Sequence, residues 1–251
     1  MPPTQRPIAE DWYRQSFDSL YPIIYEQRTV EAARPESLFS IEQTKLGPED
    51  WVLDLACGGG RHMAHLIDVA PHVVGLDYSS HLLSVAQETL GSRAKLVRAD
   101  MRRQPFENVF DVVMNFFTSF GYFQTPEENL AVVHGIAAAL RPKGRFFIDY
   151  LNRVWAENNL QSETRRLVQD FEISERRWID KAHHRINKTT VVSKNGREVS
   201  DTGESVQLYT QQEFTDLLSI GGLEVDRVFG NYDGVPPSDQ QPRMIVVGHK
   251  V

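Results

Sequence analysis

The 251-residue chain is 41% hydrophobic and 24% charged, which is ordinary for a globular protein with one sizeable core. Its 27 basic and 34 acidic side chains give a net charge of −7, which argues against a dedicated nucleic-acid surface. The single cysteine, Cys57, excludes an intramolecular disulfide and fits a reducing, cytoplasmic setting. No run of about 18 apolar residues predicts a membrane span, and Met1 to Glu10 lacks the apolar core of a signal peptide.

The first 47 residues are expected to form a helical lid. Apolar residues at mixed three- and four-residue spacing predict a helix over 8–33, with a break or kink at Pro22. A second, short helix is predicted over Ser37–Lys45 and should end at Gly47-Pro48.

Strand and helix signals alternate from Trp51 onward. Apolar runs predict strands at Trp51–Ala56, His72–Leu76, Ala94–Arg98, Phe110–Asn115 and Gly144–Leu151. The predicted helices between them are Arg61–Val69, Ser80–Leu90, capped by Ser79 or Ser80, and Asn129–Leu140. Continuous apolar strands that alternate with helices are typical of a doubly wound α/β domain, whose parallel sheet is covered on both faces.

The pattern changes after Asn152. Residues 158–210 contain segments of alternating polarity with a hairpin signal at Asn195-Gly196, which predicts an antiparallel β insertion. A helix at Glu213–Ile220 and strands at Leu223–Phe229 and Met244–His249 then return to the core. The core should therefore comprise 48–157 and 211–251, and the insertion should serve the substrate or a dimer contact. Both a monomer and a homodimer remain open.

Polar residues follow the ends of four successive predicted strands: 54–60, Asp77, Asp100 and Asn115. Ligands bind outside the carboxyl ends of parallel strands. Because Gly58, Gly59 and Gly60 are consecutive, they do not match the G-x-G-x-x-G spacing of nicotinamide sites, and a simple tight turn is the alternative. Asp77 could accept hydrogen bonds from ribose hydroxyls, or it could cap the following helix.

These segments resemble motifs of the Rossmann-like (class I) S-adenosylmethionine-dependent methyltransferase family. Val52–Gly60 resembles the first motif, with Ala56 where the first glycine is expected. The second, third and fourth motifs are matched by Gly75–Ser79, Arg98–Met101 and Phe110–Asn115. The resemblance implies a mostly parallel seven-stranded sheet and S-adenosyl-L-methionine as the cofactor.

The resemblance also implies which residues hold the cofactor. Asp77 would bind the ribose, Asp100 and the Met101 backbone would bind the adenine, and Asn115 would lie near the methionine moiety. Arg61 either pairs with the cofactor carboxylate or is a solvated surface arginine. The full set of predicted cofactor residues is Tyr25, Ala56, Gly58, Arg61, Asp77, Tyr78, Asp100, Met101 and Asn115.

The acceptor side is less defined. The aromatic-rich segment 116–123 and the tyrosines of the lid should cover the methyl group and substrate, although core packing is the alternative for several of them. The predicted substrate-pocket residues are Tyr13, Tyr21, Phe120, Tyr122 and Arg243. Nothing identifies a general base, so the catalytic residues stay unassigned. His183-His184 has no companion at metal-ligand spacing, so no metal is expected.

The sequence thus predicts an S-adenosylmethionine-dependent methyltransferase that moves a methyl group to an N, O or C nucleophile of a small molecule. The acidic charge favours a small substrate over nucleic acid. A non-catalytic sensor of S-adenosylmethionine and a nicotinamide-dependent oxidoreductase are the alternatives.

Overall fold

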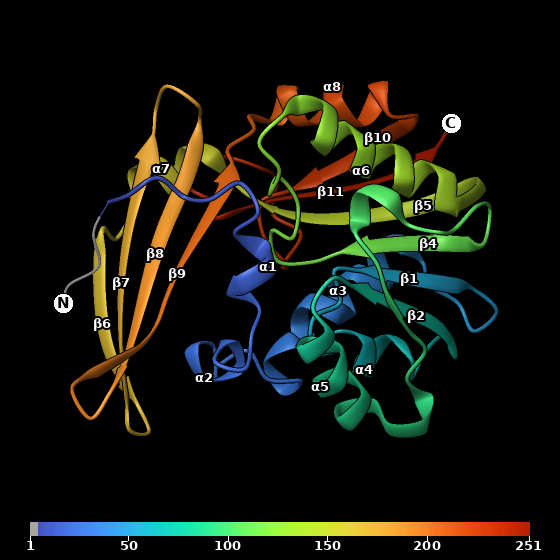
Figure 1. The fold of residues 1–251 in the computed structure, drawn as a ribbon. Helices are drawn as coiled ribbons and strands as arrows, with labels where there is room; N and C mark the ends of the chain where they lie inside the picture. The colour runs from blue at the N-terminus through green and yellow to red at the C-terminus, as the bar shows by residue number, and fades with distance from the viewer. Residues whose placement is uncertain (1–4) are drawn as a thin grey trace.

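The computed structural model describes residues 5–251, so the first four residues of the predicted lid lie outside the described part. The chain forms two β-sheets that stand side by side (Figure 1). The larger sheet has seven strands and is flanked by helices. The smaller sheet has four strands, and short N-terminal helices lie between the two sheets.

The seven-stranded sheet has the order β10-β11-β5-β4-β1-β2-β3. Its strands are β1 (Trp51–Leu55), β2 (His72–Asp77), β3 (Leu96–Arg98), β4 (Phe110–Asn115), β5 (Leu140–Leu151), β10 (Leu223–Phe229) and β11 (Arg243–Lys250). Only β11 runs antiparallel to its neighbours, β5 and β10. The chain moves outward from β1 to β3 and then returns to β4 on the other side of β1, so the strand order reverses between β1 and β4. The predicted doubly wound, mostly parallel fold is confirmed.

The alternation of side chains along each strand divides the core between the two faces. Leu53 joins one cluster with residues of α6 (Pro126–Ala139) and α8 (Gln211–Ile220). Its neighbour Val52 joins the other cluster, with residues of α3 (Arg34–Thr44), α4 (Met63–Leu66) and α5 (Ser80–Leu90). Both residues are fully buried, as expected for a strand covered on both faces.

Capping residues decide where several helices begin. Ser79 accepts a hydrogen bond from the Leu82 backbone at 3.1 Å, which confirms it as the cap of α5. Helix α6 starts at Pro126 rather than at the predicted Asn129, because Thr125 and Glu128 form a reciprocal capping box just before it.

Two helices elsewhere in the core differ from the sequence analysis. Helix α4 covers only part of the predicted 61–69, and turns make up the remainder. Helix α7 (Arg153–Asn158) was not predicted; the Asn152 side chain caps it through the Val154 backbone at 3.0 Å.

The four-stranded sheet is an antiparallel meander inserted between α7 and α8. Its strands are β6 (Glu163–Val168), β7 (Phe171–Asp180), β8 (Arg185–Lys194) and β9 (Arg197–Gln207), in that order. Asn195 and Gly196 have φ values of 51° and 74° and join β8 to β9. Positive φ at both central residues is typical of a two-residue hairpin turn, so the predicted antiparallel strands and hairpin are confirmed.

The N-terminal segment, residues 5–33, does not form the kinked helix predicted over 8–33. It contains α1 (Tyr13–Ser16), α2 (Tyr21–Ile24) and the 3₁₀ helix η1 (Glu31–Ala33); the other 3₁₀ helices are η2 (Gly91–Arg93) and η3 (Met101–Arg103). Helix α1 stops at Phe17, which has φ −108° and ψ 51°, and Pro22 lies in the first turn of α2. Proline lacks the N–H that a helix interior needs, so it is accommodated where a new helix starts.

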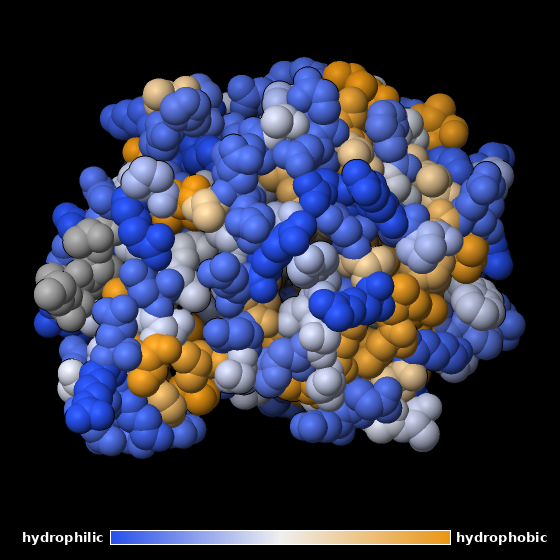
Figure 2. Space-filling view, in the orientation of Figure 1, coloured by the Kyte–Doolittle hydropathy of each residue, from blue (hydrophilic) through white to orange (hydrophobic). Residues whose placement is uncertain are grey.

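The face seen in Figure 1 is mainly hydrophilic. In the space-filling view the larger hydrophobic patch lies on the side of the seven-stranded sheet that carries β2 and α5 (Figure 2). Within residues 5–251, no helix combines the length and the apolar character needed to cross a bilayer.

Candidate active site

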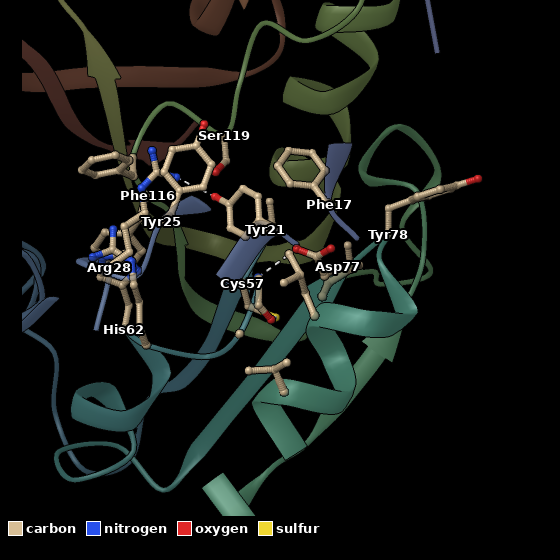
Figure 3. Close-up of a pocket in the computed structure, with 18 of the residues that line it drawn as sticks. Phe17, Tyr21, Tyr25, Arg28, Cys57, His62, Asp77, Tyr78, Phe116 and Ser119 are labelled. Atoms are coloured by element: carbon tan, nitrogen blue, oxygen red, sulfur yellow. Dashed lines mark hydrogen bonds between the residues drawn. The ribbon is translucent and has the colours of Figure 1, made fainter. Parts of the chain in front are cut away.

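A cavity of about 360 Å³ lies between the N-terminal segment and the carboxyl ends of β1, β2 and β4 (Figure 3). It is bounded by the glycine loop after β1, by the end of β2, by residues 99–101 and by residues 116–123. Its size falls within the roughly 300–1,000 Å³ of small-molecule sites. The edge of the sheet at which strand order reverses is where the sequence predicted a ligand site.

The structure brings most of the predicted site residues to this cavity. Those that line it are Tyr13, Tyr21, Tyr25, Ala56, Gly58, Arg61, Asp77, Tyr78, Asp100, Met101 and Tyr122. Asn115, Phe120 and Arg243 are not part of the lining. The role of each residue toward a ligand stays a prediction.

The glycine loop has left-handed backbone at three of its positions, one of which is Gly60 with φ 78°. Gly58 has φ 54°, and Ala56, which stands where the family motif has glycine, has φ 61°. A residue with a Cβ pays a conformational penalty there, so the local geometry explains why glycine is the usual residue. The loop turns the Gly58 N–H toward Asp77.

Asp77 is buried, and both of its carboxylate oxygens accept hydrogen bonds from backbone N–H groups. Oδ2 accepts from the Gly58 N–H and Oδ1 from the Ser79 N–H, each at 2.8 Å. Burial raises the pKa of Asp77, while these backbone hydrogen bonds act against the rise. Because Ser79 caps α5, the cap role considered for Asp77 is filled by another residue, and its carboxylate faces the cavity.

Asp100 shares its carboxylate with Arg102. The Arg102 guanidinium lies 2.6 Å from Oδ2, and its backbone N–H lies 3.0 Å from Oδ1. Burial acts to raise the pKa of Asp100, but the hydrogen bonds from Arg102 hold it below its ordinary value. Arg102 also donates to the Tyr13 hydroxyl at 2.9 Å, so it ties the N-terminal segment to the end of β3.

Asn115 joins strand ends instead of facing the cavity. Its amide donates to the Leu55 carbonyl at 2.8 Å and to the Ser119 carbonyl at 3.4 Å. It therefore fixes the loop after β4 against the end of β1.

Asp149, near the end of β5, holds the loop after β4 in place. Asp149 is fully buried and accepts from the Phe117 N–H at 2.8 Å, the Tyr232 hydroxyl at 2.5 Å and Arg243 Nε at 2.6 Å. Phe117 and Thr118 both have left-handed backbone, with φ 55° and 63°, a strain that this anchoring must offset.

The placement of the two other non-lining residues follows from their packing. Arg243 is turned beneath the loop by its bonds to Asp149 and Thr118. Phe120 is 1% exposed and packs edge-on against Phe214, with ring centres 5.3 Å apart. Arg243 thus supports the wall, and Phe120 belongs to the core.

A cluster at one end of the cavity, around Glu36 and His62, was not predicted from the sequence. His62 stacks on Phe116, with ring centres 3.9 Å apart, and its Nε2 lies 2.5 Å from Glu36 Oε2. Arg61 pairs with the same carboxylate at 3.0 Å. Burial lowers the pKa of His62 to about 4, although the bond to Glu36 acts in the opposite direction. Glu36 comes from α3, whose position relative to the glycine loop has no local sequence signal.

Asp54, in β1, should make stability depend on pH. It is 1% exposed, and its Oδ2 has no hydrogen-bond partner among the described residues. Burial, with the Asp77 charge adding to it, raises the pKa of Asp54 from 3.8 to about 8. Between these two pKa values the folded state binds more protons than the unfolded state. Asp54's contribution to the free energy of unfolding therefore falls as pH rises from 3.8 to about 8.

Asp54→Asn is therefore expected to flatten the loss of stability between pH 6.5 and 8, measured by urea unfolding at each pH. The upper part of the window is chosen because His62, with its lowered pKa, has the opposite effect below 6.5. Parallel pH profiles for the wild type and the variant would contradict the assignment.

Among residues 5–251, no group of three His, Cys, Asp or Glu side chains is arranged to hold a metal ion.

Comparisons with known proteins agree with the predicted family and with the fold. Residues 52–144 match the family model described as a methyltransferase domain. The chain is 28% identical to the cypemycin N-terminal methyltransferase of Streptomyces sp., over 90% of this chain and 97% of that protein. It is 30% identical to an uncharacterized methyltransferase of Synechocystis sp., over 58% of this chain and 68% of the relative.

A solved structure of an S-adenosylmethionine-dependent methyltransferase from Clostridium acetobutylicum has the same fold, with a TM-score of 0.78. It is 16% identical, and the match covers 95% of this chain and 99% of that one. The family match excludes the alternative of a nicotinamide-dependent oxidoreductase. The chain belongs to the class I S-adenosylmethionine-dependent methyltransferases.

Proposed function

We propose that this enzyme methylates the nitrogen of a small-molecule amine. The observation that carries the proposal is the aromatic character of the cavity wall. The rings that line it are Tyr13, Phe17, Tyr21, Tyr25, Tyr78, Phe116, Phe117, Tyr122 and Phe123. Aromatic faces attract cations, and both the methyl donor and an N-methylated product carry positive charge.

The residues present fit the cofactor. Asp77 would hold the ribose hydroxyls. Asp100 and the Met101 backbone, which also line the cavity, would hold the adenine. Ala56 and Gly58 would let the backbone approach the amino-acid end. When bound, S-adenosylmethionine supplies an electrophilic methyl group on a sulfonium.

The surroundings suit an acceptor that needs no strong base. A neutral amine would form the new N–C bond with its own lone pair as the S–CH₃ bond breaks and leaves a thioether, and the resulting ammonium would release its proton to water. His62 is the one imidazole in the described lining, and its pKa of about 4 makes it a weak base. The residues of the cavity would instead contribute orientation and exclusion of water.

The name of the cypemycin N-terminal methyltransferase supports an amine acceptor, since that relative covers nearly the whole chain. Amino sugars and peptide N-termini both carry such an amine. The four-stranded sheet contributes no residue to the described lining, so its role at the acceptor or in a dimer stays a prediction. We also propose that the enzyme acts in the cytoplasm, without a nucleic-acid partner, as a monomer or homodimer.

The test is transfer of labelled methyl groups to a panel of amino sugars, amino acids and short peptides with free N-termini. Each amine is paired with its N-acetylated form, which removes the nucleophilic lone pair and keeps the remainder of the molecule. Label in the amines alone supports the proposal. Equal label in the acetylated partners would point to an oxygen or carbon acceptor and would contradict it.

A further inference from the structure

Arg28 lies on the cavity wall, and the groups in direct contact with it are neutral. Its guanidinium carbon is 3.8 Å from the centre of the Tyr25 ring and 4.6 Å from the centre of the Phe117 ring. Its Nη1 donates to the Tyr21 hydroxyl at 2.6 Å. Figure 3 shows Arg28 near Tyr25 and His62, at the opposite end of the cavity from Asp77 and Tyr78.

Two further guanidiniums surround the same Phe117 ring, and both have a carboxylate. The Arg61 carbon is 5.0 Å from the ring centre and the Arg243 carbon is 5.3 Å from it. Arg61 pairs with Glu36 at 3.0 Å and Arg243 pairs with Asp149 at 2.5 Å. Within residues 5–251, no carboxylate lies within ion-pair distance of Arg28.

Of the three guanidiniums around this ring, Arg28 is therefore the one without a directly paired acid among the described residues. The Glu204 charge also acts on Arg28, but Glu204 is itself paired with Lys188 at 2.7 Å. A charge without a counter-charge in a cavity lowers the stability of the folded protein unless a ligand of opposite charge pairs with it. A guanidinium also matches the two oxygens of a carboxylate in geometry.

Arg28 is held in place before any ligand arrives. The Tyr25 ring beneath it is fixed by two residues of the four-stranded sheet. The Tyr25 hydroxyl donates to Glu204 at 3.0 Å and accepts from the Lys188 ammonium, which itself pairs with Glu204 at 2.7 Å. A cation that is already positioned loses less conformational entropy when it binds an anion.

We propose that Arg28 is the carboxylate-binding residue of the cavity, and that Tyr25, Lys188 and Glu204 position it. The carboxylate belongs either to the amino-acid end of the cofactor or to the acceptor. This rests on the proposed function for the cofactor site, and it assigns to Arg28 the role that the sequence suggested for Arg61.

Two nucleosides separate the possible sources of the carboxylate. S-adenosylhomocysteine carries the amino-acid end, whereas 5′-methylthioadenosine has the same adenine, ribose and thioether without it. Isothermal titration of both into the wild type, Arg28→Met and Arg61→Met measures whether each arginine acts on that end. Sodium benzoate, titrated into protein saturated with S-adenosylhomocysteine, probes a carboxylate on the acceptor side.

If the cofactor is the source, Arg28→Met weakens S-adenosylhomocysteine roughly tenfold to a hundredfold and leaves methylthioadenosine unchanged. If the acceptor is the source, affinity for both nucleosides is kept and benzoate binding is lost in Arg28→Met. Arg28→Lys should retain part of either effect, since it keeps the charge and loses the fork of donors.

Three results would overturn the proposal: equal weakening of both nucleosides by Arg28→Met, no effect on any of the three ligands, or selective weakening of S-adenosylhomocysteine by Arg61→Met alone. Failure of the wild type to bind either nucleoside would instead refute the cofactor site of the proposed function. None of these measurements depends on the identity of the amine.

Discussion

Replacing Asp77 with alanine is expected to lower the affinity for S-adenosylmethionine by roughly ten- to a hundredfold, the effect of losing hydrogen bonds to a charged group. The carboxylate would hold the ribose, and it also accepts the Gly58 N–H at 2.8 Å, so its loss loosens the glycine loop. Titration calorimetry of the wild type and the variant measures the difference.

Asp77→Asn is the matched control, because it keeps one acceptor oxygen and the side-chain volume. Its affinity should fall between those of the wild type and the alanine variant. The affinity of Asp77→Ala for adenosine, which carries the ribose and no amino-acid end, should fall by a similar factor relative to the wild type. Equal affinity for S-adenosylmethionine in the wild type and Asp77→Ala would show that the ribose assignment is wrong.

Asp149→Asn is expected to cost the largest amount of stability, about 3–5 kcal/mol, because it leaves the Arg243 guanidinium without its buried counter-charge. For a chain of this size that corresponds to a fall in Tm of roughly 6–20 °C. The variant also weakens the acceptor for the Phe117 N–H, in a loop with left-handed backbone. Thermal unfolding without ligand gives the measurement.

The double variant Asp149→Asn/Arg243→Met tests the cause. Removing the second charge should restore part of the lost stability, so the two changes should be clearly non-additive. Purely additive losses would mean that the ion pair is not what Asp149 contributes.

The sequence contained enough information for the sheet and for much of the cavity wall. Strands such as β1 and β4 are buried on both faces, and their continuous apolar runs are visible without any knowledge of their partners. Because the carboxyl ends of parallel strands share one edge, Asp77 and Asp100 could be placed together from their positions after strands. Both line the cavity.

The other end of the cavity could not be predicted in this way. Arg28 depends on Tyr25, and Tyr25 depends on Lys188 and Glu204, more than 160 residues further along the chain. Such contacts have no local periodicity or spacing. The same holds for Glu36, whose link to His62 depends on how α3 packs. Arg243 was expected in the pocket, but Asp149, 94 residues earlier in the chain, holds it beneath the wall.

The contact between the N-terminal segment and the four-stranded sheet affects the order in which the protein folds during synthesis. Arg6 pairs with Asp201 at 2.9 Å, and Ser16 donates to the Gly203 carbonyl at 2.9 Å, so this segment finds its partners only after β9 has been synthesised. Contacts of such long sequence separation form late in folding. On the ribosome, the seven-stranded sheet also has to wait for β10 and β11. We therefore expect the cofactor site to close only once β9, β10 and β11 have emerged, so that nascent chains without these strands would not retain S-adenosylmethionine.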